Sequence, residues 1–281
     1  MPSAPRKPRV RSFDPAKVRA ALEGQVRAVR DVVAVVCAEP DAAALLAAPS
    51  GVGKWTAGEL ITHLTGALEL LPRHIEAQRS GESPSVRADI TLPEYAAGSG
   101  ARAAEVAERA VAAAEGLAGR EPNSLVDALD RVAERLSAAL GDTGSVKAVP
   151  TGLGAMSLSD YVVTRLLEAV VHGDDLATAT GTVVRHDRQA LATVTRLLAD
   201  VLAAKAPGGS VEVRIPPFAV IQCVEGPQHT RGTPPNVVET DPITWIRLAT
   251  GRLTWGEALD STAVTASGER ADLSAQLPLL T

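Results

Sequence analysis

The sequence predicts a multidomain chain, α then α+β: a helical bundle up to about residue 206 and a small α+β domain after it. Alanine is abundant and aromatic residues make up only 2% of the chain, which favours helices packed through small aliphatic side chains. From residue 14 onward the apolar residues recur at helical spacing. After Pro207-Gly208-Gly209 they alternate instead, as in strands.

The first two long helices have recognisable start signals. Asp14 and Pro15 supply an N-cap and an N1 proline for a helix that we expect to run to about residue 39. A loop, APSGVGK, follows, and the stretch TAGE that begins at Thr56 then matches a capping box. We expect this next helix to carry His63 and to kink or break at Pro72.

The following segments complete the predicted bundle. Residues 80–93 are expected to form a loop, and 94–118 and 123–140 two Ala-rich helices. VPTGLGAMS is expected to be a loop leading into a helix over 157–179, and Asp187 caps a last long helix before the Pro-Gly-Gly linker. Five or six helices joined by short links suggest an up-down bundle.

The segment after the linker is predicted to form the α+β domain. Strand patterns cover 211–215, 220–225 and 236–241, helical spacing occurs within 242–260, and the chain ends with a strand and a turn. The expected divisions are therefore a disordered basic tail over 1–13, the helical bundle over 14–206 and the α+β domain over 210–281.

Charge and hydropathy exclude several classes of protein. A net charge of −5 gives no electrostatic footprint for nucleic acid. No run approaches the roughly 18 apolar residues of a membrane helix, and no apolar segment follows the basic start as in a signal peptide. Cys37 and Cys223 form no CxxC motif and are expected to be buried thiols of a reducing compartment. We therefore expect a cytoplasmic protein, a monomer or homodimer, without a nucleic-acid partner or a membrane span.

The helix over 157–179 carries the candidate site. At about 100° per residue, a polar seam falls within an arc of roughly 80°, and the other faces are apolar. The spacing alone leaves two interpretations, a solvent-exposed stripe or a buried seam that has a chemical role. The seam consists of Tyr161, Arg165, Glu168, His172 and Asp175.

A metal site would give the seam that role. Glu168 and His172 are at i,i+4 and can reach one ion, and this ligand set suits Zn²⁺, or less specifically Ni²⁺ or Fe²⁺. His63 is the best candidate for a third ligand, although a lone histidine on a helix is more often a core residue. Asp175 could orient His172, and Arg165 could pair with Glu168 or hold an anionic substrate. Weaker candidates, near element ends or in loops, are His74, His186 and His229.

Two motifs resemble those of a known family. WTAGELITHL (55–64) and DYVVTRLLEAVVHGDDLATATG (160–181) are similar to the N-terminal metal-binding domain of mycothiol-dependent maleylpyruvate isomerases, which are DinB-like four-helix bundles. The resemblance covers about the first two-thirds of the chain and implies that His63, Glu168 and His172 bind zinc. Asp175 matches the acidic residue that usually follows in the second motif.

The C-terminal part resembles a sterol-carrier-like domain, which often accompanies the bundle in actinobacterial proteins of this family. The resemblance is carried by VIQCVEGPQHTRGTPPNVVETDPITWIRLATGRLTWGEAL (220–259) and by the ending VTASGERADLSAQLPLL. In the isomerases an arginine of this domain helps to bind the substrate. The resemblance therefore implies a catalytic candidate among Arg231, Arg247 and Arg252, with Arg231 favoured; each of them could equally be a surface charge.

The resemblance implies a zinc-dependent isomerase or transferase. A low-molecular-weight thiol, expected to be mycothiol, would enter the open metal position, lose its proton and attack a small electrophilic substrate. The alternative is a non-catalytic module whose sterol-carrier-like domain binds an apolar or lipid ligand, with the metal site structural or vestigial. A third hypothesis, an interaction protein that uses the bundle alone, predicts an exposed apolar patch and no convergent polar cavity.

Overall fold

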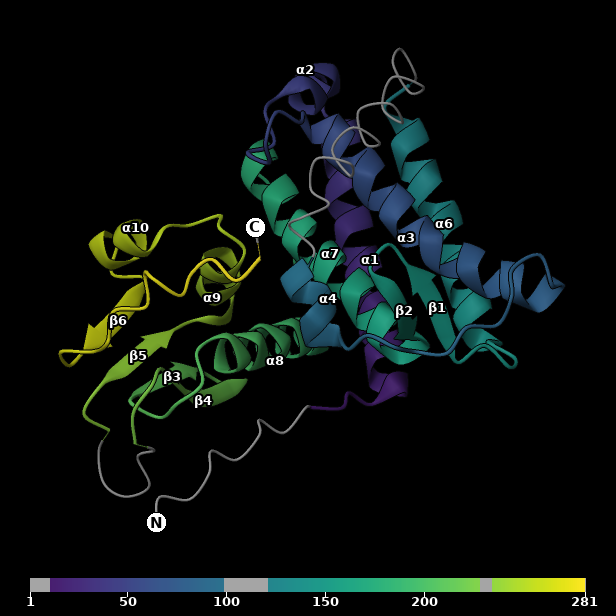
Figure 1. Cartoon of the computed structure of the whole chain (residues 1–281). Helices are drawn as coiled ribbons and strands as arrows, with labels where there is room; N and C mark the ends of the chain where they lie inside the picture. Colours follow the sequence, from purple (N-terminus) through teal and green to yellow (C-terminus); the bar gives the residue numbers. More distant parts are fainter. Residues whose placement is uncertain (1–10, 99–120, 228–233, 281) are drawn as a thin grey trace. The chain divides into compact units, whose positions relative to one another are not determined.

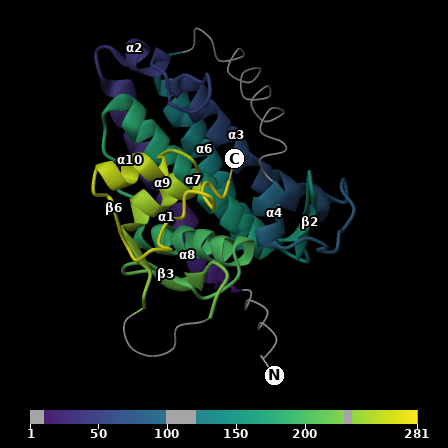
Figure 2. The same cartoon turned by 60° about the vertical axis from the view of Figure 1, so that its left-hand side comes forward.

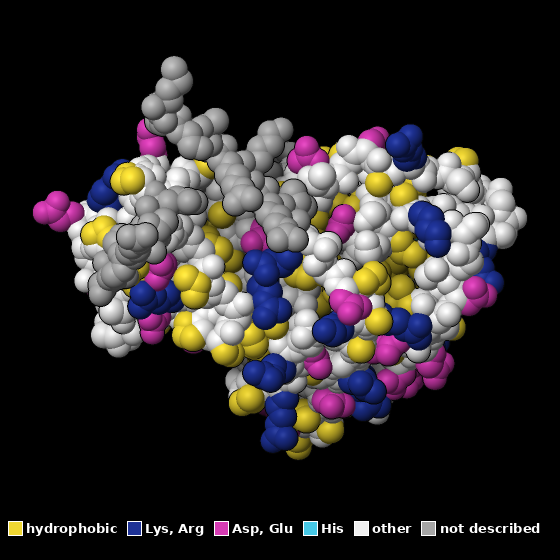
Figure 3. All heavy atoms as spheres, turned by 90° about the horizontal axis from the view of Figure 1, so that it is seen from below, with side chains coloured by type: hydrophobic (Ala, Val, Ile, Leu, Met, Phe, Trp, Pro, Cys, Tyr) yellow, Lys and Arg dark blue, Asp and Glu magenta, His cyan; other side chains and the backbone are white. Residues whose placement is uncertain are grey.

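The computed structural model describes residues 11–98, 121–227 and 234–280 (Figure 1). Among these residues, no helix combines the length and the apolarity that crossing a membrane requires. On the face seen in Figure 3, acidic and basic side chains are interspersed. The described residues form two compact units, a helical unit of 13–92 and 121–190 and an α+β unit of 11–12, 93–98, 191–227 and 234–280.

The helical unit is a four-helix bundle. Each of two helices, α1 and α3, packs against both α6 and α7 (Figures 1 and 2). Leu and Val side chains fill the space between them, among them Leu22, Leu68, Leu129 and Leu166. The helices of the bundle are α1 (Pro15–Ala38), α3 (Ala57–Ser80), α6 (Asn123–Gly141) and α7 (Leu158–Thr180), and the shorter α2 (Ala42–Ala47) and α4 (Leu92–Gly98) follow α1 and α3 along the chain.

The predicted start signals are confirmed. The Asp14 carboxylate accepts hydrogen bonds from the backbone N–H groups of Ala16 and Lys17 at the start of α1. At the start of α3, the Thr56 hydroxyl and the Glu59 carboxylate each accept a backbone N–H of the other residue, which completes the capping box.

Of the kink or break expected at Pro72, the break is wrong, because α3 continues through this residue to Ser80. A proline inside a helix costs about 3 kcal/mol. Three large side chains around it, Leu68, Leu71 and Ile75, are fully buried in the bundle. Each such burial contributes about 1.5–3 kcal/mol, so tertiary packing outweighs the local preference of the proline.

The segment predicted as the loop VPTGLGAMS is instead a hairpin of β1 (Ala148–Thr151) and β2 (Gly154–Ser157). The loop prediction was wrong because residues outside the segment complete the structure: the Asp89 carboxylate accepts the N–H of Ala155, and Ile90 pairs with Met156. Short α2 was not predicted. Of the helix expected over 94–118, the structure describes the first turns as α4, and residues 99–120 lie outside the described part of the chain.

The α+β unit is built on a four-stranded sheet of order β4-β3-β5-β6. Strand β3 is antiparallel to β4 and parallel to β5, and β6 is antiparallel to β5. Alternation along β3 buries Val211, Val213 and Ile215 on one face and leaves Glu212 and Arg214 on the other. The elements are α8 (Arg188–Lys205), β3 (Val211–Ile215), β4 (Ala219–Cys223), β5 (Val237–Thr240), α9 (Pro242–Ala249), α10 (Trp255–Asp260) and β6 (Val264–Ser267).

Most of helix α8 belongs to the α+β unit, whereas we expected the bundle to extend to residue 206. The indole Nε1 of Trp245 donates to the carbonyl of Thr195, and Arg196 donates to the carbonyl of Phe218. The fully buried Leu198 and Leu202 lie on the same helix. The Pro-Gly-Gly segment therefore connects two elements of one unit.

Gln25 ties α1 to α7 inside the bundle. Its side chain is fully buried, and its amide Nε2 donates to the carbonyl of Ala169 at 3.2 Å and contacts His186 Nδ1 at 2.9 Å. Its Oε1 accepts the N–H of Asp187 at 3.1 Å. One amide therefore joins two helices and the segment before α8.

Gly173 allows this close approach. A Cβ at this position would lie 3.0 Å from Val29 Cγ2 and 3.4 Å from Gln25 Nε2. Because Gly173 directly follows His172, the packing of α1 also sets the position of the helix segment that carries the seam.

We expect Gln25→Leu to lower the free energy of unfolding by about 2–3 kcal/mol, because it leaves buried polar partners without hydrogen bonds. The matched control is Gln78→Leu, which removes one hydrogen bond, to the carbonyl of Ala148, at a half-buried position. It should cost about 1 kcal/mol or less. Urea denaturation measures both, and equal losses would contradict the role of Gln25.

Candidate metal centre

The structure brings the three predicted ligands together between α3 and α7. Glu168 Oε2 lies 3.6 Å from His63 Nε2 and 3.2 Å from His172 Nε2. One ligand atom from each of the three residues lies within 4.8 Å of the other two. His172 is buried, and the side chains of His63 and Glu168 are 11% and 30% exposed. The cluster is therefore largely buried, and Glu168 is its most accessible member.

These separations suit a small divalent ion. Tetrahedral ligands at about 2.1 Å from zinc lie about 3.4 Å from one another. The two distances from the Glu168 oxygen, 3.2 and 3.6 Å, bracket this value. Two imidazole nitrogens and one carboxylate oxygen are also a donor set that zinc accepts, with room for a further ligand. The two distances and the donor set are therefore compatible with a divalent metal ion at this cluster.

Asp175 lies where it can orient His172. Its Oδ2 is 3.0 Å from His172 Nδ1, so this nitrogen carries a proton and Nε2 faces Glu168. Burial lowers the pKa of His172, but the hydrogen bonds to Asp175 and Glu168 and their charges raise it to about 9. In the metal-free protein His172 is therefore a cation at neutral pH.

Glu168 is held as an anion. Burial raises its pKa, but hydrogen bonds from His172 and His63 and the charge of Arg165 outweigh this and hold the pKa well below its usual range. The guanidinium Nη2 of Arg165 lies 3.9 Å from Glu168 Oε1. A carboxylate that stays ionised is available to a cation at any pH near neutrality.

Arg165 is enclosed within the bundle. Its side chain is 5% exposed, donates to the carbonyl of Ala67 at 3.1 Å and lies over the Tyr161 ring, with 4.8 Å from Cζ to the ring centroid. Of the two roles predicted for Arg165, this environment favours pairing with Glu168. An anionic substrate would have to enter the core of the bundle to reach it.

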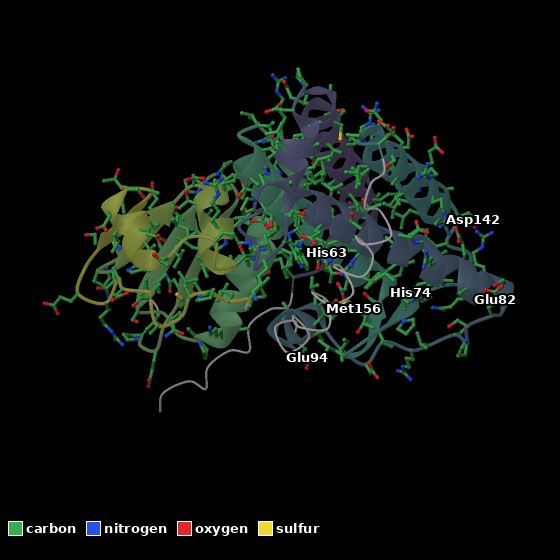
Figure 4. All side chains as sticks on the ribbon, turned by 90° about the horizontal axis from the view of Figure 1, so that it is seen from above. His63, His74, Glu82, Glu94, Asp142 and Met156 are labelled. Carbon is green, nitrogen blue, oxygen red and sulfur yellow. The ribbon has the colours of Figure 1, made fainter. Side chains whose placement is uncertain are left out.

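Of the weaker histidine candidates, the two that the structure describes do not join the cluster. His74 lies farther along α3 than His63, toward Glu82 (Figure 4), and its ring contacts Tyr161 with centroids 5.7 Å apart. Burial and the charge of Arg165 lower the pKa of His74. His186 contacts Gln25, and His229 lies outside the described residues.

The arginine candidates belong to the C-terminal part of the chain. Arg231 lies outside the described residues. Arg247 is in the last turn of α9, and Arg252 follows that helix, exposed, with Nη1 donating to the carbonyl of Thr250 at 2.8 Å. Their assignment as catalytic residues stays a prediction.

One neighbour of the cluster was missed at the level of sequence. Trp55 was given no role at the site, yet its ring centroid lies 4.7 Å from that of His63. The two residues are eight positions apart, and the chain between them turns from loop to helix. Spacing on a single helix therefore gave no signal for this contact.

Fold and cluster together define a four-helix bundle with a His-Glu-His group between two helices, followed by an α+β unit. Residues 22–177 match the family model described as the mycothiol maleylpyruvate isomerase N-terminal domain. The chain therefore belongs to this family. Residues 187–279 match the model described as a bacterial SCP ortholog, a range that includes α8 with the sheet.

The fold also matches solved structures over most of its length. Crystal structures of the mycothiol-dependent maleylpyruvate isomerase, and of a mutant of it with one histidine changed to alanine, each align with a TM-score of 0.60 and 17% identity. Each alignment covers 92% of this chain and 95% of that chain. At this identity the likeness establishes the fold. No curated protein matches the chain.

Zinc uptake should release about one proton at pH 7, because the ion must displace the proton on His172 Nε2. Since the pKa of His172 is raised to about 9, the apparent affinity should increase with pH, by about tenfold per unit, and level off above pH 9. Calorimetric titrations in buffers of different ionisation enthalpy measure the proton count. An affinity that stayed constant between pH 7 and 9 would contradict this assignment.

Proposed function

We propose that this protein is a metal-dependent enzyme that uses a low-molecular-weight thiol, mycothiol, as the nucleophile for isomerisation or thiol transfer on a small electrophilic substrate. The observation that carries the proposal is the convergence of His63, Glu168 and His172 from two separate helices onto one point. Membership of the mycothiol maleylpyruvate isomerase family supports the same reaction class.

We propose His63, Glu168 and His172 as the protein ligands of a Zn²⁺ ion. Zinc with three protein ligands keeps one open position, and there it lowers the pKa of a thiol so that a thiolate forms at neutral pH. The side chains of the bundle hold the ligands in place: Asp175 fixes the His172 tautomer through Nδ1, and Arg165 lies beside the far oxygen of Glu168.

The apolar surroundings of the cluster support a reactive role. His172 is buried, and the flanking residues Ala169, Val170 and Leu176 of α7 are buried as well. Ionic interactions strengthen when water is excluded, so a thiolate would meet a stronger field here than at an exposed site.

We propose Arg231 and Arg252 as the candidates for binding a substrate carboxylate.

The alternative function, binding of an apolar or lipid ligand by the sterol-carrier-like unit, has the match of residues 187–279 in its favour. The described core of that unit holds large side chains of its own, since Trp245 is fully buried, together with Leu198, Leu202 and Val213. A cavity of about 460 Å³ lies beside Arg214 and Glu239, and its other lining residues are apolar: Pro216, Pro217, Phe218, Ala219 and Val220. We place the enzyme before the lipid carrier because three potential metal ligands converge in the bundle.

The proposed ligands are tested by metal content. We expect protein purified without added metal to contain about one equivalent of zinc, and His63→Ala and His172→Ala each to lose most of it, because two ligands do not hold the ion tightly. His74→Ala is the matched control, since His74 is a partly buried histidine on the same helix as His63 but outside the cluster. Elemental analysis that found equal zinc in all four proteins would overturn the site.

The reaction class is tested with the same proteins. Maleylpyruvate is the first substrate to try, because the isomerase structures that this chain resembles carry that name. Turnover should require mycothiol and should disappear in His172→Ala while persisting in His74→Ala. A zinc-loaded wild-type protein that transferred mycothiol to an electrophile without isomerising maleylpyruvate would identify a transferase. Failure to use any thiol would overturn the proposal.

A further inference from the structure

Trp55 packs directly on a proposed metal ligand. The centroids of the Trp55 and His63 rings are 4.7 Å apart, with 39° between the ring planes. Trp55 is 9% exposed, so the indole is almost entirely enclosed. The His63 ring also contacts the His172 ring in a T-shaped arrangement, with centroids 5.1 Å apart and 86° between the ring planes. The imidazole of His63 therefore has an aromatic neighbour in addition to the other ligand.

The backbone of Trp55 is fixed by the loop before α3. Its N–H donates to the carbonyl of Val52 at 3.1 Å, and its carbonyl accepts both the N–H and the hydroxyl of Ser50 at 2.8 Å. The next residue, Thr56, is the N-cap of α3. The hydrogen bonds with Val52 and Ser50 therefore hold Trp55 at the position where its indole contacts the imidazole of His63.

We propose that Trp55 is a positioning residue of the metal site, which holds the His63 ring in the orientation that directs Nε2 toward Glu168. This inference rests on the proposed zinc site. His63 is joined to the rest of the cluster only across the α3–α7 interface, whereas Glu168 and His172 share one helix. The His63 ring must therefore be oriented from its own side of that interface, where Trp55 contacts it.

The indole also suits the charge of the bound state. An imidazole that ligates a divalent cation carries partial positive charge, and the electron-rich face of tryptophan attracts positive charge. A large aliphatic residue could fill the same volume but would supply neither the flat contact surface nor this attraction. Trp55→Leu should therefore bind zinc more weakly than Trp55→Phe, which keeps an aromatic face.

The test compares three variants by zinc affinity, measured in competition with a chromophoric chelator. Trp55→Leu should weaken zinc binding by about tenfold or more, as loss of a residue that orients a ligand typically does. Trp55→Phe should recover most of that loss. Thr56→Ala removes the cap of α3 but keeps the indole, so it should lower the melting temperature while leaving zinc affinity within about threefold.

Tryptophan fluorescence is a second measurement, and a change in helix stability alone would not alter its response to zinc. Zinc addition to the wild-type protein should change its tryptophan emission, and the change should be lost in Trp55→Phe although that variant still binds zinc. Equal zinc affinity in wild type and Trp55→Leu, or an equal loss in Thr56→Ala, would overturn the inference while leaving the zinc site intact. A wild-type protein that bound no zinc would overturn the proposed function, and this inference with it.

Discussion

A carboxylate enclosed between two imidazoles is the constraint on which the bundle depends. Glu168 would be costly to enclose alone, since an unpaired buried charge destabilises a fold by several kcal/mol. Its oxygens lie 3.2–3.9 Å from His172, His63 and Arg165, so every one of these cationic or polar groups faces the same point. Of these three partners His63 comes from α3, so the packing of α3 against α7 decides whether its imidazole reaches the carboxylate.

The other helices hold that arrangement from outside. Gln25 joins α1 to α7, and the missing side chain at Gly173 lets the two helices approach closely. Helix α6 is tied to α1 by the paired hydrogen bonds of Arg30 and Asp130. None of these contacts uses the side chain of a proposed ligand, and their role is to restrict motion of the helix that carries two of the three. Side chains held in this way would not need to rearrange in order to bind the proposed ion.

Much of the bundle and of the candidate site could be predicted from the sequence, because helix caps and the spacing of residues on one helix are local features. Asp14 and Thr56 marked helix starts, and the spacing of Glu168 and His172 placed two ligands on one face. Three features depended on distant partners. Pro72 stays helical because the bundle buries its neighbours, the 148–157 hairpin needs Asp89, and Trp55 meets His63 across a helix cap. Local pattern cannot specify contacts of this kind, and the pairing of His63 with α7 was supplied by resemblance to a family.

The hairpin has one further consequence for the site. Strand β2 ends at Ser157, which is also the N-cap of α7, so no linker separates strand from helix. The register that pairs Ala148 with Ser157 therefore sets the rotational phase of α7. A slip of one residue would turn the helix by about 100° and carry both of its ligands out of the bundle interior. The hairpin therefore fixes the direction in which the side chain of Glu168, eleven residues after Ser157, leaves the helix. Insertions or deletions in 148–157 should for this reason be far less tolerated than substitutions there.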